Sequence, residues 1–409
     1  MNIAVAQSGG PTCAINASLV GVFSEALKEP SIDAIFGSIN GIEGMIDDHL
    51  IDLKTMIRTN EDMEMLLQTP STVLGSCRYK LKDWHDDDTV YQKIIHCFEQ
   101  RQIGAFFYIG GNDSMDTIKK LSDFAILTGQ KQKFLGVPKT IDNDLALTDH
   151  TPGFGSAAKY IGASTKEVIR DALGLTYKKE MITIIEVMGR NAGWLTGATA
   201  LAKTEECEGP DLIYLPEVPF DIDAFLSKIK DLLKEKKSII VAVSEGIKLP
   251  DGRYVCELSG GGDYVDAFGH KQLTGTAAYL ANFLGAEIGC KTRAVEFSTL
   301  QRSASHMASR VDINEAFMVG GAAVKAADEG DSGKMVVIDR VSDDPYMSAA
   351  GIYDVHKIAN NEKTVPRAWL NETADYVTEE FINYIEPLIQ GDYPPFMVNG
   401  LPQHLVLKK

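Results

Sequence analysis

The chain has 409 residues, of which 44% are hydrophobic and 24% charged, an ordinary globular composition that is enough for two or three domain-sized cores. Its formal net charge of −17 disfavours non-specific binding to nucleic acid or to an anionic membrane surface. The six cysteines are scattered without a Cys-x-x-Cys pair, and the sequence shows neither a signal-peptide pattern nor a run of about 18 apolar residues. We therefore expect a reduced cytoplasmic protein without nucleic-acid or membrane partners, in which an anionic substrate meets a local cluster of Arg and Lys.

Short apolar runs alternate with longer amphipathic stretches over the first 300 residues or so. The runs are rich in β-branched and aromatic residues and mostly lack period-two alternation, which is typical of buried parallel strands. This alternation predicts an α/β fold with doubly wound, mainly parallel sheets. We expect a mobile loop at 258–270, and polar connections with short helices after about Asp328. The expected strands are 2–7, 105–111, 133–138, 181–189, 211–216, 238–246 and 293–298, and the expected helices are 14–28, 89–101, 113–127, 156–173 and 220–234.

Two glycine pairs end predicted strands and precede predicted helices. Because ligands bind beyond the carboxyl ends of parallel strands, both turns are candidate phosphate sites. Gly9 and Gly10 form the first pair, for which a tight turn without a ligand is an equal alternative. Gly110 and Gly111 form the second, and the Asn-Asp-Ser that follows can either contact a ligand or simply cap the helix.

The segment "PKTIDND" follows the strand at 133–138 and concentrates polar side chains in a few residues. Asp142, Asn143 and Asp144 would be costly to bury without partners, so packing alone does not explain them. A carboxylate here can deprotonate a substrate hydroxyl, and Lys139 can hold a transferring phosphoryl group. A solvated turn with Asx hydrogen bonds is the alternative.

Further cations and one acid follow later predicted strands. Arg190 ends "EVMGR" and Glu245 lies in "SEG", while Arg293 and Arg302 flank the strand at 293–298. Each has an ordinary alternative as a surface ion pair, a helix cap or a solvated side chain. Together with the glycine turns and the base candidate, however, they describe phosphoryl transfer between anions, in which Mg²⁺ normally bridges the donor oxygens.

At this point the sequence resembles the bacterial-type phosphofructokinase family over most of its first 310 residues. The resemblance rests on seven motifs in family order, and it implies two α/β domains with the active site in the cleft between them. The motifs are "SGG" at Ser8, "GSCR" ending at Arg78, "GGNDS" at Gly110, "PKTIDND" at Pro138, "EVMGR" ending at Arg190, "SEG" at Ser244, and "TR…LQR" at Arg293 and Arg302.

The resemblance also implies a role for each matching residue. Asp142 is similar to the general base that takes the proton from the 1-hydroxyl of fructose 6-phosphate, and Lys139, Asp113 and Arg190 complete the catalytic set. The remaining matches concern the substrates and the metal. Those for the sugar phosphate are Thr140, Ile141, Asp144, Met188, Gly189, Glu245, Arg293, Thr299 and Arg302; those for the donor phosphates are Gly9, Gly10, Arg78, Gly111 and Ser114; those for Mg²⁺ are Asn112 and Asp113.

Departures from the family pattern concern the phosphoryl donor. Members that use ATP have Gly where this chain has Asp113, and usually Gly where it has Lys139; Ile42 stands where they tend to have an aromatic residue. These changes resemble the pyrophosphate-dependent branch, since a carboxylate at Asp113 would repel a nucleotide α-phosphate. Asn112 replaces a metal-linked Asp.

Two further departures bear on the distal phosphate and on assembly. Thr299 replaces a His at the 6-phosphate end, and Met181 replaces an Arg that a neighbouring subunit donates. We therefore expect a homodimer, with a homotetramer as the alternative.

The expected domain plan has three parts. Residues 1–140 bind pyrophosphate and are completed by a returning segment, 141–310 bind the sugar phosphate, and 311–409 pack across both. The alternatives are an ATP-dependent phosphofructokinase, a pyrophosphate-dependent kinase acting mainly on sedoheptulose 7-phosphate, a NAD or lipid kinase, and a non-catalytic sugar-phosphate-binding regulator.

Overall fold

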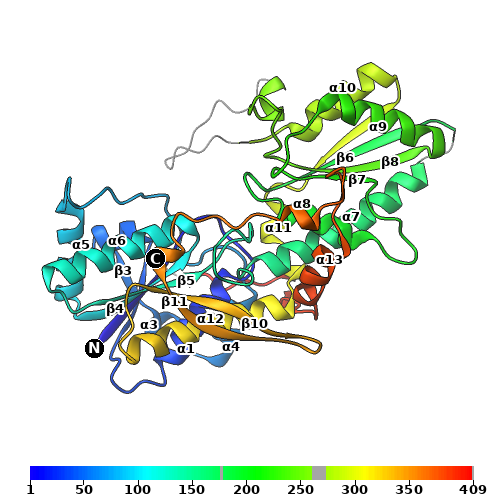
Figure 1. Ribbon diagram of the computed structural model, residues 1–409. Helices are drawn as coiled ribbons and strands as arrows, with labels where there is room; N and C mark the ends of the chain where they lie inside the picture. Colours follow the sequence, from blue (N-terminus) through cyan, green and yellow to red (C-terminus); the bar gives the residue numbers. More distant parts are fainter. Residues whose placement is uncertain (176–177, 260–272, 408–409) are drawn as a thin grey trace. The chain divides into compact units, whose positions relative to one another are not determined.

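The computed structural model describes residues 1–175, 178–259 and 273–407, which form two compact units. Unit 1 contains residues 1–156, 302–363 and 390–409, and carries the N and C labels in Figure 1. Unit 2 contains residues 157–301 and 364–389. The expected loop at 258–270 lies, apart from its first two residues, outside the described part of the chain.

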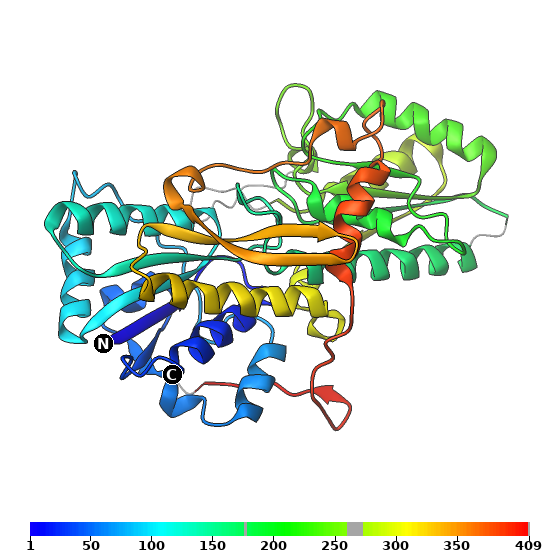
Figure 2. The same cartoon turned by 60° about the horizontal axis from the view of Figure 1, so that its bottom comes forward.

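A seven-stranded sheet forms the centre of unit 1 (Figures 1 and 2). Its inner strands are parallel, and its two edges are closed by antiparallel pairs, β10 with β11 and β2 with β3. In spatial order the strands are β11 (Tyr346–Asp354), β10 (Lys334–Asp343), β5 (Lys133–Pro138), β4 (Ile103–Gly110), β1 (Asn2–Gln7), β2 (Ile35–Ser38) and β3 (Leu50–Asp52).

Helices cover both faces of this sheet, because alternate residues of its buried strands point to opposite sides. Ile3 and Val5 of β1 belong to a core with α1, α4 and α12, whereas Ala4 and Ala6 belong to a core with α2, α5 and α6. The helices of unit 1 are α1 (Ile15–Ala26), α2 (Ile42–Ile46), α3 (Leu53–Met56), α4 (Asn60–Gln68), α5 (Thr89–Gln100), α6 (Asn112–Thr128) and α12 (Arg310–Asp328).

Unit 2 has a four-stranded parallel sheet in the order β7-β8-β6-β9. α9 and α10 pack on one face of it through a single apolar core. Its strands are β7 (Leu212–Tyr214), β8 (Ser238–Ser244), β6 (Met181–Val187) and β9 (Lys291–Glu296), and its helices are α8 (Trp194–Gly197), α9 (Ile222–Glu235), α10 (Thr276–Ile288) and α13 (Glu379–Ile385).

The chain crosses between the units at four places, and two helices contain two of these boundaries. α7 (Phe154–Leu175) includes the step from Ser156 to Ala157, and α11 (Leu300–Ser303) includes the step from Gln301 to Arg302. The short elements that remain are η1 (Ala198–Ala202), η2 (Val255–Ser259), η3 (Ser305–Met307), η4 (Val355–Lys357), η5 (Arg367–Trp369), η6 (Glu386–Ile389), β12 (Met397–Val398) and β13 (Leu401–Pro402).

The predicted α/β fold class with mainly parallel sheets is confirmed, and the seven predicted strands lie within about two residues of observed ones. The short helices expected after Asp328 are present, as η4, η5, α13 and η6, but the expectation missed two strands. This stretch holds the two longest described strands, β10 and β11, and β10 joins the large sheet beside β5. Only Met335–Ile338 of β10 is fully buried, so the apolar run is too short to stand out in the sequence.

The units divide the chain at other positions than 140 and 310. Residues 141–156 stay with unit 1 because they hydrogen-bond to its sheet and to α12: Asp149 N donates to Ile338 O at 2.8 Å, and Gly153 N donates to Asp312 Oδ1 at 2.7 Å. No helix in the described ranges combines the length and apolar character that crossing a lipid bilayer requires.

Candidate active site

The site residues of unit 1 gather where β1, β4 and β5 end. Because these strands are parallel neighbours, their carboxyl ends lie at one edge of the sheet. Gly9 and Gly10 follow β1, α6 starts directly after β4, and "PKTIDND" overlaps the end of β5. The sheet topology thus explains why three motifs that are up to 129 positions apart in the chain meet at one place.

Lys139 lies against the first glycine turn. Its side chain is 2% exposed, and its ammonium donates to Gly10 O at 2.8 Å. Gly9 has φ +75°, and a Cβ added there would lie 3.0 Å from Lys139 Nζ, so a side chain at this position would crowd the lysine. The turn and the lysine together form a buried positive site.

Two arginines add charge to this site. A Cβ on Gly10 would lie 3.3 Å from an Nη of Arg302, and both Arg302 and Arg78 act electrostatically on Lys139. The pKa of Lys139 is lowered to about 8, chiefly by burial and to a smaller extent by these arginines, whereas Asp142 and Asp144 oppose the change. Three cations therefore converge on the glycine turn, as an anion site requires.

Asp142 and Asp144 form an acidic pair in the same cluster. Burial, followed by repulsion from Asp142 and Glu362, raises the pKa of Asp144 to about 7. Asp142 N donates to Thr140 Oγ1 at 3.1 Å, and that hydroxyl lies 3.3 Å from Asp142 Oδ2. A buried carboxyl group whose pKa is raised beside a second acid is typical of proton-transfer sites.

The first turn of α6 presents two polar side chains. The amide of Asn112 is buried and interacts with Asp144, where it opposes the rise in the pKa of that carboxyl group. Within the described residues the Asp113 carboxylate has no ion pair or hydrogen bond; only its backbone carbonyl accepts one, from Thr117. Neither side chain caps the helix, since Gly111 is the N-cap and no side chain bonds there.

The other predicted residues of unit 1 are mostly structural neighbours of this cluster. Ser114 is 3% exposed and begins the buried face of α6, and Ile141 is 7% exposed. Among the described residues, no group of three or more His, Cys, Asp or Glu side chains is arranged to hold a metal ion.

In unit 2, the arginine loop (residues 188–193) follows β6. The Ser244 hydroxyl donates to Gly189 O, and Gly193 N donates to Glu217 Oε1 at 2.8 Å. A Cβ on Gly246 would lie 2.1 Å from Arg190 O, so only glycine fits beneath Arg190. Because β6 and β8 are paired neighbours, Arg190 and the predicted sugar ligand Glu245 emerge from adjacent strand ends.

The positions of Arg293 and Arg302, two predicted sugar-phosphate ligands, differ from the sequence prediction. Arg293 lies inside β9, opposite Thr183, and does not precede the strand, because β9 starts at Lys291. Its guanidinium pairs with Asp171 of α7 at 2.7 Å. Arg302 belongs to unit 1, whereas Arg293 and the exposed Thr299 belong to unit 2. Sequence spacing did not reveal this division, since Thr299 and Arg302 are only three positions apart.

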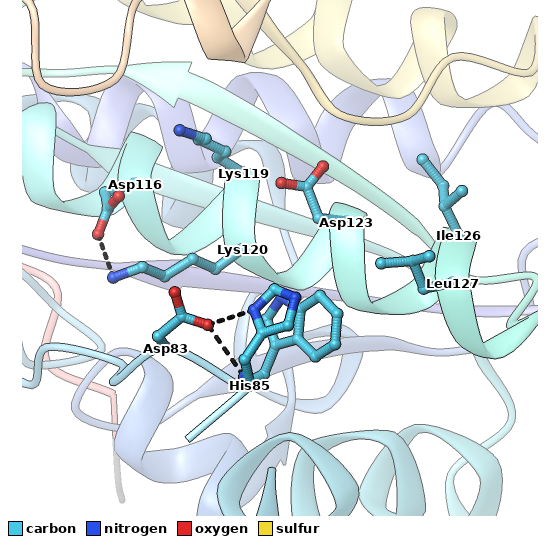
Figure 3. Close-up of a pocket in the computed structure, with 9 residues that line it drawn as sticks. Asp83, His85, Asp116, Lys119, Lys120, Asp123, Ile126 and Leu127 are labelled. Carbon is cyan, nitrogen blue, oxygen red and sulfur yellow. Dashed lines mark hydrogen bonds and ion pairs between the residues drawn. The ribbon is translucent and has the colours of Figure 1, made fainter. Parts of the chain in front are cut away.

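A separate pocket of about 370 Å³ lies on the outer side of α6 and contains none of the predicted site residues (Figure 3). Its charged groups are largely paired with one another: Lys120 bonds Asp116 at 2.7 Å, and His85 bonds Asp83 at 2.6 Å. Such internal pairing leaves little to recognise a ligand, so the candidate active site remains at the strand ends.

The fold and the site define a doubly wound α/β protein with a buried, lysine-containing anion site next to paired acids. Comparison with known proteins identifies its class: residues 2–327 match the family model described as Phosphofructokinase, and the chain belongs to that family.

Three relatives illustrate the similarity. The chain is 40% identical to a pyrophosphate–fructose 6-phosphate 1-phosphotransferase of Halomonas elongata, over 100% of this chain and 96% of the relative. It matches the crystal structure of a pyrophosphate-dependent phosphofructokinase of Nitrosospira multiformis with a TM-score of 0.89 and 37% identity, covering 100% of this chain and 96% of that one. It is also 31% identical to a sulfofructose kinase of Alkalicoccus urumqiensis, over 92% of this chain and 93% of the relative.

Proposed function

We propose that this protein transfers a phosphoryl group reversibly from Mg-pyrophosphate to the 1-hydroxyl of fructose 6-phosphate, giving fructose 1,6-bisphosphate and phosphate. The observation that carries the proposal is the position of Lys139, whose buried ammonium lies at the Gly9-Gly10 turn beside Asp142. Relatives that match over their full length and carry the name of this activity support it.

The residues of unit 1 bind the phosphoryl donor and accept the proton. Asp142 accepts the proton of the sugar hydroxyl as the oxygen attacks in line, and Lys139 neutralises charge on the departing phosphate. Arg78, Gly9 and Gly10 bind the donor, together with Gly111 and Ser114. Arg302, assigned to the sugar's 6-phosphate, also adds positive potential at the glycine turn.

The residues of unit 2 bind the sugar phosphate. Arg190 orients the transferring group with Met188 and Gly189, Glu245 accepts from a sugar hydroxyl, and Arg293 and Thr299 bind the distal phosphate. The placement of both sets of residues in one cleft remains a prediction, as do the individual roles.

Mg²⁺ fits this site as a metal that arrives with its phosphate. The buried amide of Asn112 and the carboxylate of Asp113 offer two oxygens, and Mg²⁺ characteristically takes one or two protein ligands while keeping waters and substrate phosphates. Once bound, the ion would draw charge from the donor oxygens.

We assign donor choice to Asp113. Its carboxylate, free of partners within the described chain, lies in the first turn of α6, where the positive helix end would otherwise attract an additional phosphate. Asp113→Gly is expected to lose pyrophosphate activity without gaining efficient ATP use while Lys139 remains. The matched control is Asp223→Gly, which makes the same change in the exposed first turn of α9 and leaves the rate unchanged. Substantial ATP activity in Asp113→Gly would show that Asp113 is the only barrier.

The activity itself is tested by product stoichiometry. The purified chain with Mg²⁺, pyrophosphate and fructose 6-phosphate should form fructose 1,6-bisphosphate and phosphate in equal amounts, and the reverse reaction should proceed when both products are supplied. Sedoheptulose 7-phosphate and sulfofructose are the comparison acceptors. Tight binding of fructose 6-phosphate without phosphoryl transfer would contradict the proposal.

We further propose a cytoplasmic homodimer. The resemblance implies that tetrameric members have an Arg at position 181, which one subunit donates to its neighbour. This chain has Met181 instead, which supports the smaller assembly. The mass of the assembly can be measured by light scattering during size-exclusion chromatography. The mass of a tetramer would contradict the proposed homodimer.

A further inference from the structure

A short segment far along the chain is bonded to the acid loop (residues 139–153). Glu362 and Lys363 are the last residues of unit 1 before the chain enters unit 2 at Thr364. Lys363 N donates to Asp144 O at 2.8 Å, and Glu362 pairs with Leu145 in an isolated antiparallel bridge. Two residues about 220 positions downstream thus extend the loop like a strand.

The Lys363 side chain adds three bonds to the same loop. Its ammonium donates to Asp149 O at 2.6 Å, Thr148 O at 3.2 Å and Asn143 Oδ1 at 3.3 Å. An ammonium has three donors and no acceptor, so these bonds use its full capacity. Two of these acceptors are backbone carbonyls, and the third belongs to Asn143, which lies between the two acids in the chain.

Asn143 combines full burial with an uncommon backbone conformation. It is fully buried, and its φ of +53° is a left-handed conformation that non-glycine residues seldom adopt. Its position in the chain fixes the direction of both neighbours, Asp142 and Asp144. A bond that fixes the Asn143 side chain therefore fixes the geometry of the proposed base.

We infer that Lys363 is a positioning residue for phosphoryl transfer: it clamps the acid loop through Asn143, Thr148 and Asp149 so that Asp142 faces the substrate hydroxyl. This inference rests on the proposed function only for the role of Asp142. The clamp itself is a property of unit 1 and is measured without substrate.

The first test is hydrogen–deuterium exchange of the unliganded protein. Lys363→Met keeps most of the side-chain volume and removes the donors, so amides of residues 140–149 should exchange faster while α1 and α12 stay protected. The control Lys325→Met removes a charge of the same unit whose partner, Glu25, lies 3.6 Å away at the surface, and its exchange pattern should equal that of the wild type. Unchanged exchange in the loop, or faster exchange throughout unit 1, would overturn the clamp. Because this measurement needs no catalysis, its failure is distinct from failure of the proposed function.

The second test is kinetic. A misplacement of about 1 Å can cost on the order of 10²-fold in rate, so Lys363→Met should lower kcat by about 10- to 100-fold while KM for fructose 6-phosphate changes little. Asn143→Gly removes the bonded amide yet tolerates the positive φ. If Lys363 acts through Asn143, the double variant should lose little more than the worse single variant. Additive losses, an unchanged kcat, or a rise in KM alone would overturn the inference.

Discussion

The acid loop of unit 1 and the arginine loop of unit 2 follow buried parallel strands in the same way, yet they are held by different means. The acid loop is fixed by charged side chains from distant segments, since Lys363 bonds it at three points and the buried His150 lies between Asp149, at 2.8 Å, and Glu315, at 2.6 Å. The arginine loop is held mainly by close packing, with Gly246 beneath Arg190 and a serine hydroxyl on Gly189, and by one carboxylate, since Gly193 N donates to Glu217 Oε1.

The two loops should therefore respond to different perturbations. Contacts made by charged side chains are sensitive to protonation and to the removal of a single donor. Burial opposes protonation of His150, but Glu315 and Asp149 raise the pKa of His150 to about 9. The imidazole therefore stays charged at neutral pH. A packed contact such as that between Gly246 and Arg190 does not depend on protonation, but it does not accept an added methyl group. Three experiments test this difference between the loops.

The largest effect is expected from Asp142→Asn in the acid loop. A general base of this kind contributes about 10²- to 10⁴-fold, and the amide cannot accept the hydroxyl proton. The pyrophosphate-dependent kcat should fall by that factor while KM changes little. Asp86→Asn, an exposed change in the same unit, should keep the full rate. A loss of less than about tenfold in Asp142→Asn would remove Asp142 from the role of base.

A smaller effect is expected from Gly246→Ala in the packed loop. The new methyl carbon would lie 2.1 Å from Arg190 O, a backbone atom that cannot simply rotate away. Overpacking of this kind costs about 1–3 kcal/mol, so unit 2 should unfold at lower temperature and Arg190 should be displaced, with a fall in kcat/KM. Gly174→Ala is the matched control, because a Cβ there meets nothing within 4 Å. Equal melting curves for the two variants would contradict the packing explanation.

The smallest effect is the pH dependence of the wild-type enzyme. Lys139 has its pKa lowered to about 8 by burial, so its ammonium loses its proton as the pH rises through that value. The kcat/KM for pyrophosphate should then fall, by about tenfold per pH unit well above the pKa. In Lys139→Arg the charge persists, and this limb should disappear from whatever rate remains. A limb that stays in the variant belongs to the substrate, and its persistence would contradict the assignment.

Much of the fold was predictable because buried parallel strands carry long apolar runs. β1, β4 and β5 combine such runs with glycine turns, so both the strands and the phosphate-type turns could be identified in the sequence. The hairpin of β10 and β11 was missed because most of its residues are only partly buried, and pairing register, which sequence does not show, holds it in place.

The site was predictable only where chemistry and local sequence coincide. "PKTIDND" could be found because its acids cannot be explained by packing, and the structure places Lys139, Asp142 and Asp144 together. Lys363 lies in "NNEKTV", an ordinary polar stretch, and its bonds reach residues more than 200 positions away. Such long-range partners arise from the tertiary fold, and a single sequence carries no signal for them.

The most direct test of the proposed activity is the ratio of kcat/KM for pyrophosphate to that for ATP, measured on the wild-type protein with Mg²⁺ and saturating fructose 6-phosphate. We expect a ratio far above one, because Asp113 repels an additional phosphate and Lys139 accepts the charge of the departing one. A ratio below one would contradict a pyrophosphate-dependent enzyme and identify an ATP-dependent phosphofructokinase.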